Sequence, residues 1–358
     1  MKTKDAFKTK SQIISFSLRL NQSLLLPLFR SIFTRHSSIP PGRRPYKAGG
    51  CNRQFFWLFA LGFFFLSCSS PKPIPPQLFR AQELSELGVK RYHESRYDDA
   101  FSYLSQSLEI NRAIANRAGA ARNLVSIGVI LIKIGKIPEA IPLLEEAVRI
   151  QEEIPDREGK SESLGALGLA RFYQGEKTLA LENLTQALSL AKASRNKIAQ
   201  ASILNSLGLV QRAAGQMNPA REYYQKALQI NRRIQDLSSQ ASNLNNLGSL
   251  ALEENNYPAA LSYFQAALKI DQRIENQPGI ASDLSNLGRL EETQGRLESA
   301  LDDYLQARAV NEKLGIGYRI RQDLENLIRV YQALGQSEKA EALRKEREQL
   351  RSEFKDLQ

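Results

Sequence analysis

The sequence predicts an all-α fold, a solenoid of seven helix–turn–helix repeats, because three residue columns recur every 40 residues. Alanine and leucine each recur seven times without a break, and glycine recurs six times. The columns run from Ala100 to Ala340, from Leu84 to Leu324 and from Gly88 to Gly288, and the glycine column ends at Ile328. Seven units of 40 residues therefore fill residues 77–356.

Each unit is expected to form two helices joined by a turn. In the fifth unit, small and apolar residues at helical spacing define one helix around 244–251 and a second around 260–270. Between the helices lies a column suited to the left-handed conformation that ends a helix: Gly135, Gly175, Gly215, Asn255, Gly295 and Gly335. The small residues let two helices approach closely, and the leucine column fills the space between them.

The predicted units divide the chain evenly. They are 77–116, 117–156, 157–196, 197–236, 237–276, 277–316 and 317–356. In the last unit, Arg344 and Arg347 stand in columns that are apolar or small elsewhere. A charged outer face is what a solenoid needs where no further repeat follows, so this unit is predicted to be the cap.

These columns resemble the tetratricopeptide repeat. The matching positions are Leu84, Leu87, Gly88, Ala100, Leu104 and Ser107, with their equivalents in later units. The common repeat has about 34 residues, and the longer unit with the segment 244–248, Leu-Asn-Asn-Leu-Gly, resembles the kinesin-light-chain-like branch. The resemblance covers about 280 of the 358 residues. It implies a right-handed α-solenoid that binds other proteins.

A leader of 67 residues precedes the repeats. Residues 55–66 are twelve consecutive apolar residues, too short to span a bilayer but typical of the hydrophobic region of a signal peptide. The segment 65–68, Phe-Leu-Ser-Cys, resembles the lipobox of bacterial lipoproteins, which implies lipidation of Cys68. Residues 68–76 are then a lipidated Cys and a proline-rich tether. The expected location is the bacterial cell envelope, anchored to a membrane and facing the periplasm or the exterior.

The leader also accounts for the basic charge of the chain. The net charge is +11, but residues 1–67 hold 11 Lys and Arg against the single acid Asp5. The body from residue 68 onward is nearly neutral, so we expect no nucleic-acid partner.

No enzyme motif is present in the sequence. There is no phosphate-binding loop, no His-Glu-x-x-His and no Cys-x-x-Cys, and only two His occur, at His36 and His93. We therefore predict no catalytic residue, no cofactor and no metal site.

The predicted binding residues lie on the first helix of each unit, on the face that lines the concave groove in the family that the sequence resembles. A row of amides occupies it: Asn205, Asn245, Asn246, Asn286 and Asn326. An amide both donates and accepts hydrogen bonds, so such a row suits the main chain of an extended peptide. The alternative is that a concave face simply needs small polar residues.

Further along the same face the residue character changes from apolar to charged. The apolar half contains Val129, Phe172 and Leu209, and the charged half contains Arg212, Arg289 and Arg329 together with Glu292. This gradient predicts a ligand with an apolar part and an acidic part. Part of the apolar half, Ile132 and Leu169 above all, has packing between repeats as its alternative role.

The sequence thus predicts a membrane-anchored, non-enzymatic scaffold that binds a partner protein or peptide in the groove. The alternative function is a chaperone-like module that holds envelope proteins. A second alternative is a cytoplasmic regulator with a misassigned N-terminus, because the leader is longer than an ordinary signal peptide.

Overall fold

The computed structural model describes residues 75–355, and this part of the chain is helical throughout, without strands. Its helices form seven antiparallel pairs, which confirms the predicted solenoid of helix–turn–helix repeats. We call the first helix of each pair inner: α3 (Pro76–His93), α5 (Arg117–Lys133), α7 (Arg157–Gln174), α9 (Lys197–Ala213), α11 (Leu237–Glu253), α13 (Gln277–Thr293) and α15 (Gly317–Ala333). The outer helices are α4 (Tyr97–Ala113), α6 (Ile137–Glu153), α8 (Lys177–Ala193), α10 (Met217–Arg233), α12 (Tyr257–Arg273), α14 (Leu297–Lys313) and α16 (Ser337–Lys355).

The recurring columns form the core. Every alanine of the column from Ala100 to Ala340 is fully buried, and the leucine column is buried except at Leu284, which is half-buried. The glycine column lies directly against the outer helix of its own repeat. A Cβ at Gly248 would lie 2.5 Å from the Phe264 ring, so the two helices meet too closely there for any side chain.

The turn within each of repeats 2 to 7 has the predicted left-handed residue, with φ between 58° at Asn255 and 96° at Gly175, and Ser95 takes the same conformation in repeat 1. Five of the six turns between repeats also use this conformation, at residues that are mostly not glycine: Ala115, Arg195, Gln235, Glu275 and Gly315. The turn after α6 instead has Ile154 in an extended conformation. Asn or Asp follows directly in the first four of those five turns. At the start of α9, for example, Asn196 Oδ1 accepts a hydrogen bond from the Ala199 N–H at 2.9 Å and caps the helix.

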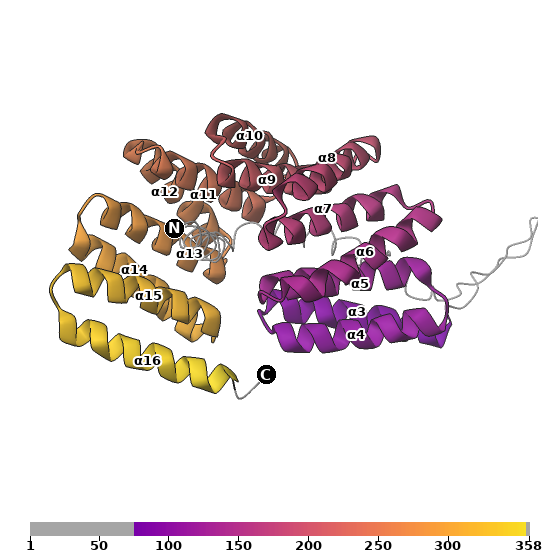
Figure 1. Ribbon diagram of the computed structural model, residues 1–358, viewed down its shortest axis with the longest axis horizontal. Coiled ribbons are helices and arrows are strands. Elements are labelled where there is room, and N and C mark those ends of the chain that lie inside the picture. The colour runs from indigo at the N-terminus through magenta and orange to yellow at the C-terminus, as the bar shows by residue number, and fades with distance from the viewer. Residues whose placement is uncertain (1–74, 356–358) are drawn as a thin grey trace, which may run out of the picture.

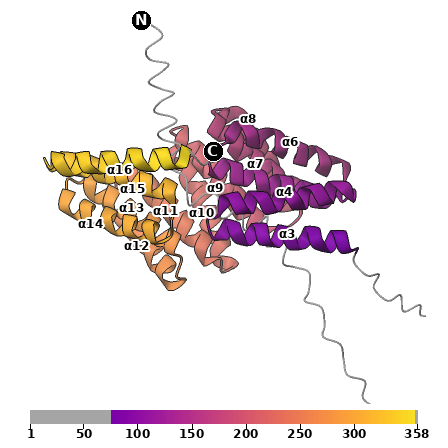
Figure 2. The ribbon, with the colours of Figure 1, turned by 90° about the horizontal axis from the view of Figure 1, so that it is seen from below.

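The helix pairs follow one another around a nearly closed ring, with the inner helices toward its centre (Figure 1). Viewed from below, α16 lies on one side and α3 and α4 on the other (Figure 2). The ends meet at aromatic side chains, because the rings of Tyr97 in α4 and Tyr318 in α15 lie 6.4 Å apart. Lys133 Nζ lies 6.0 Å from the centre of the Tyr318 ring. The first and last repeats are therefore in contact.

The outward side of the last helix is charged. Helix α16 packs against α15, and its outward positions are exposed charged residues such as Lys339, Glu341 and Lys345. A neutral or apolar outer face would leave the end of the solenoid open to association.

Candidate functional site

The predicted amide row lies on successive inner helices and is hydrogen-bonded from repeat to repeat. Asn246 Nδ2 donates to Asn205 Oδ1 at 2.7 Å, and Asn286 Nδ2 donates to Asn245 Oδ1 at 3.1 Å. Asn243, which sequence reasoning did not select, also donates to Asn205 Oδ1, at 2.9 Å. The amides thus link the inner helices of repeats 4, 5 and 6.

The row differs in exposure along its length. Asn205 is fully buried, and Asn245 and Asn246 are 5% and 3% exposed. Asn286 and Asn326 are half-buried. The surface that this row offers therefore lies mainly in repeats 6 and 7, and its binding to a peptide stays a prediction.

The predicted apolar half of the groove belongs to the core. Val129 and Leu209 are fully buried and Phe172 is 9% exposed, and all three lie in one apolar cluster. Ile132 and Leu169 lie in the same cluster, in line with their alternative role in packing.

Arg212 is also buried, next to acidic and phenolic groups. Its Nε lies 3.4 Å from Glu253 Oε1, and the residue is 2% exposed. Burial raises the pKa of the neighbouring Tyr224 to about 12, and the positive charge of Arg212 opposes that shift. The buried Arg212 thus has a carboxylate partner, Glu253, that is itself exposed.

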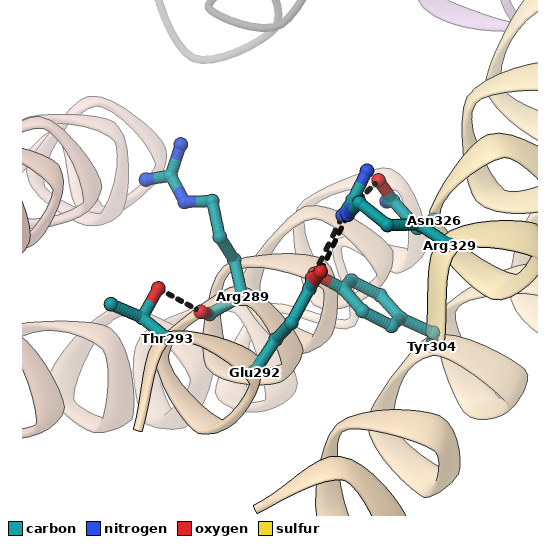
Figure 3. Close-up of polar contacts among 6 residues, drawn as sticks. All are labelled: Arg289, Glu292, Thr293, Tyr304, Asn326 and Arg329. Atoms are coloured by element: carbon teal, nitrogen blue, oxygen red, sulfur yellow. Dashed lines mark hydrogen bonds and ion pairs between the residues drawn. The ribbon is translucent and has the colours of Figure 1, made fainter. Parts of the chain in front are cut away.

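The charged end of the face lies in repeats 6 and 7 (Figure 3). Arg329 binds Glu292 with two hydrogen bonds, from Nε at 2.5 Å and from Nη2 at 2.8 Å. Arg329 Nη2 also donates to Asn326 Oδ1 at 3.2 Å, and the Tyr304 hydroxyl donates to Glu292 at 2.9 Å. Burial and the charge of Glu292 raise the pKa of Tyr304, so its hydroxyl remains a donor at neutral pH.

Arg289 points away from this network (Figure 3). Its Nη2 donates to Ser249 Oγ on the neighbouring inner helix at 3.0 Å, and the residue is half-buried. Arg289 and Arg329 therefore place two guanidinium groups on the inner helices of repeats 6 and 7, and the charge of Arg329 is paired with Glu292. The sequence pattern placed Glu292 on this face but did not reveal Tyr304, which lies on the outer helix α14 and donates to Glu292.

Nothing in the part of the chain that the structure describes suggests a metal centre or a bilayer span. No cluster of three or more His, Cys, Asp and Glu in residues 75–355 has the arrangement of a metal site. None of the described helices is both long and apolar enough to cross a membrane. Cys68 and the hydrophobic segment 55–66 lie outside the described residues.

Solved structures share this fold. BtubC (BKLC) from P. vanneervenii is 26% identical, with a TM-score of 0.51, over 61% of this chain and 91% of that one. A Rap protein in complex with competence and sporulation factor is 12% identical, with a TM-score of 0.65, over 80% of this chain and 78% of that one. The Rap conjugation gene regulator of plasmid pLS20, in complex with the Phr* peptide, is 14% identical, with a TM-score of 0.61, over 82% and 81% of the two chains.

No curated protein matches the chain in sequence. The family profile described as tetratricopeptide repeat matches residues 81–153, 120–193, 162–233 and 239–313. Proteins of this family are in general interaction modules for other proteins. Because the matched segments cover more than half of the sequence, the chain belongs to the tetratricopeptide repeat family.

Proposed function

We propose that this protein is a non-enzymatic scaffold that binds an extended segment of a partner protein along the inner helices of repeats 6 and 7. The observation that carries the proposal is the set of half-buried polar residues on this face: Asn286, Arg289, Asn326 and Arg329. Amides at this spacing suit the main chain of a peptide, and guanidinium groups suit carboxylates.

Two proteins of the same fold support the peptide as a ligand class. The Rap structures are complexes with competence and sporulation factor and with the Phr* peptide. An extended peptide gains affinity from main-chain hydrogen bonds and specificity from its side chains. Arg289 is the residue that we assign to an acidic side chain of the ligand, because its half-buried guanidinium group lies on this face and suits a carboxylate.

We further propose that the scaffold is held at a membrane of the cell envelope by a lipid on Cys68. The apolar run 55–66 followed by Ser67 and Cys68, and then the proline-rich segment 69–76, support this anchor. The tether would hold the solenoid away from the bilayer surface.

The test of the binding proposal starts from peptides selected from a random phage-displayed library against the whole protein. The affinity of a selected peptide is then measured for the wild type and for Arg289→Gln, with Arg233→Gln on the exposed side of α10 as the matched control. We expect Arg289→Gln to weaken binding several-fold and to reduce its salt dependence, because a screened attraction is removed. Equal affinities for all three proteins would refute the proposed face.

A further inference from the structure

A column of residue pairs joins each outer helix to the inner helix of the next repeat. The two members of a pair are 12 residues apart, and every one of these side chains is at most 4% exposed. The pairs are Asn111 and Asn123, Gln151 and Ser163, Ala191 and Ile203, Asn231 and Asn243, Asp271 and Asp283, and Asn311 and Asp323.

Most of these pairs contain their own hydrogen-bond donor. Asn231 Nδ2 donates to Asn243 Oδ1 at 2.7 Å, and Asn311 Nδ2 donates to Asp323 Oδ2 at 2.6 Å. The third pair, Ala191 and Ile203, is apolar and needs no donor. A buried polar pair of this kind is stable only when one of its two side chains donates a hydrogen bond to the other.

The joint between repeats 5 and 6 differs because both members are carboxyls. Asp271 is 3% exposed and Asp283 is fully buried. No N–H or O–H of the described residues donates to Asp283 Oδ2, although Asn245 Nδ2 donates to Oδ1 of the same carboxyl. A proton between the two carboxyls would supply the missing donor.

The surroundings of the pair favour retention of that proton. Burial raises the pKa of both carboxyls, and the charge of Asp271 raises that of Asp283 further. The groups that face them are amides: Asn245 from α11, and Asn276 from the turn before α13, whose Nδ2 donates to Asp271 Oδ1 at 3.0 Å. Among the described residues, no Lys, Arg or His contributes to the pKa of either carboxyl. Ionisation of both would therefore place two uncompensated negative charges in the core.

The same joint is connected to the concave face. Asn245 donates to Asp283, and its Oδ1 accepts from Asn286 Nδ2 at 3.1 Å. A hydrogen-bonded chain thus leads from the buried carboxyls through Asn245 to an amide of the predicted binding row.

We propose that Asp271 and Asp283 share one proton, and that loss of this proton loosens the joint between repeats 5 and 6 and the Asn245–Asn286 contact on the concave face. The solenoid would then contain, among its six joints, one that responds to pH above neutrality. This inference rests on the proposed function, because the joint would change the face that is proposed to bind the peptide. Its test measures stability without a ligand, so either proposal can be refuted without the other.

The test compares the stability of the wild type with that of Asp271→Asn between pH 7 and pH 9. Asn stands at the equivalent position in repeats 1, 4 and 6, and with Asp283 it would recreate the Asn311–Asp323 pair. The folded pair holds a proton that the unfolded carboxyls, with ordinary pKa values of 3.8, have released. The folding equilibrium constant of the wild type should therefore fall with rising pH, by up to about tenfold per pH unit for one proton.

In Asp271→Asn this fall should disappear, because the new amide donates to Asp283 and no second carboxyl repels it. Asp323 and Asp303, whose pKa values burial raises to about 6, titrate below the chosen range. Tyr318, with a pKa of about 8, titrates within it, but all three residues are present in both proteins, so the difference between wild type and variant reports on the carboxyl pair. Parallel pH dependences of wild type and variant would overturn the proposal. If Asp271→Asn does not fold, Asp283→Asn gives the same comparison, since Asn243 stands at that position in repeat 5.

A second measurement locates the effect. Hydrogen exchange, corrected for the intrinsic effect of pH, should become faster in α12, α13 and the facing part of α11 of the wild type at pH 9, and not in the variant. Faster exchange spread evenly over all repeats would contradict a local joint.

Discussion

Substitution of Gly248 by Ala tests the closest approach within the glycine column. The new methyl group would lie 2.5 Å from Phe264 Cε1 and 2.7 Å from Cδ1. Carbon atoms prefer separations of about 3.5–4.0 Å, so the ring would have to move by about 1 Å. Phe264 is fully buried in an apolar cluster with Ala251, Ala260 and Leu290, and protein interiors have few voids that would take up such a movement.

The expected cost follows from two opposing effects. Overpacking a core costs about 1–3 kcal/mol. Replacing Gly by Ala inside a helix returns up to about 1 kcal/mol. We therefore expect Gly248→Ala to lower the free energy of unfolding by about 1–2 kcal/mol, measured by urea denaturation followed by circular dichroism.

A double-mutant cycle separates the two effects. With Phe264→Ala as the background, the ring is gone and Gly248→Ala should become neutral or stabilising by up to about 1 kcal/mol. The last repeat follows the same rule, that glycine is needed only where a bulky residue of the outer helix faces it. There Arg344 stands at the position of the Phe264 ring, and Ile328 stands at the position of Gly248. If Gly248→Ala stabilised the wild-type protein as much as it stabilises the Phe264→Ala protein, the close contact between Gly248 and Phe264 would not exist.

Two further predictions concern the ring closure and the anchor. Burial disfavours ionisation of Tyr318, but the charges of Lys133 and Arg319 outweigh it and lower the pKa to about 8, so ultraviolet absorbance should show one tyrosine ionising before the others. Lys133→Met should move this step to higher pH, and an unchanged step would mean that Lys133 in repeat 2 does not meet Tyr318 in the last repeat. Metabolic labelling with a fatty-acid analogue should mark the wild type, and Cys68→Ser should lose the label; an unlabelled wild type would refute the anchor.

The sequence was sufficient to predict the repeat architecture and its packing columns. Ala180, like the rest of its column, had to be small because the backbone of the neighbouring helix lies beside it: a Cβ at Gly168 would lie 3.1 Å from the Ala180 carbonyl oxygen. Such a requirement is the same in every repeat, so it appears as one residue type at a constant spacing.

The polar residues were less predictable, because their role depends on the partner and not on the position alone. Asn205 was selected for its amide, which suits a peptide, but the amide accepts hydrogen bonds from Asn243 and Asn246 within the protein. The column of Asp271 and Asp283 changes residue type from repeat to repeat, so periodicity did not reveal it.

The ring closure could not be predicted either. Contact between Tyr97 and Tyr318 depends on the small rotation of each repeat relative to the previous one, summed over all repeats. The 40-residue spacing defines the repeat but contains no information on that rotation.

The most direct test of the proposed function measures affinity and melting temperature on the same protein, Asn286→Ala with Asn326→Ala, using a peptide selected against the wild type. Each amide hydrogen bond contributes about 0.5–1.5 kcal/mol, so loss of two should weaken binding on the order of tenfold. The melting temperature should change little, because both side chains are half-buried and Asn286 makes one hydrogen bond to Asn245. Unchanged affinity with a lowered melting temperature would mean that the amides serve only to join the repeats, and would contradict the proposed binding face.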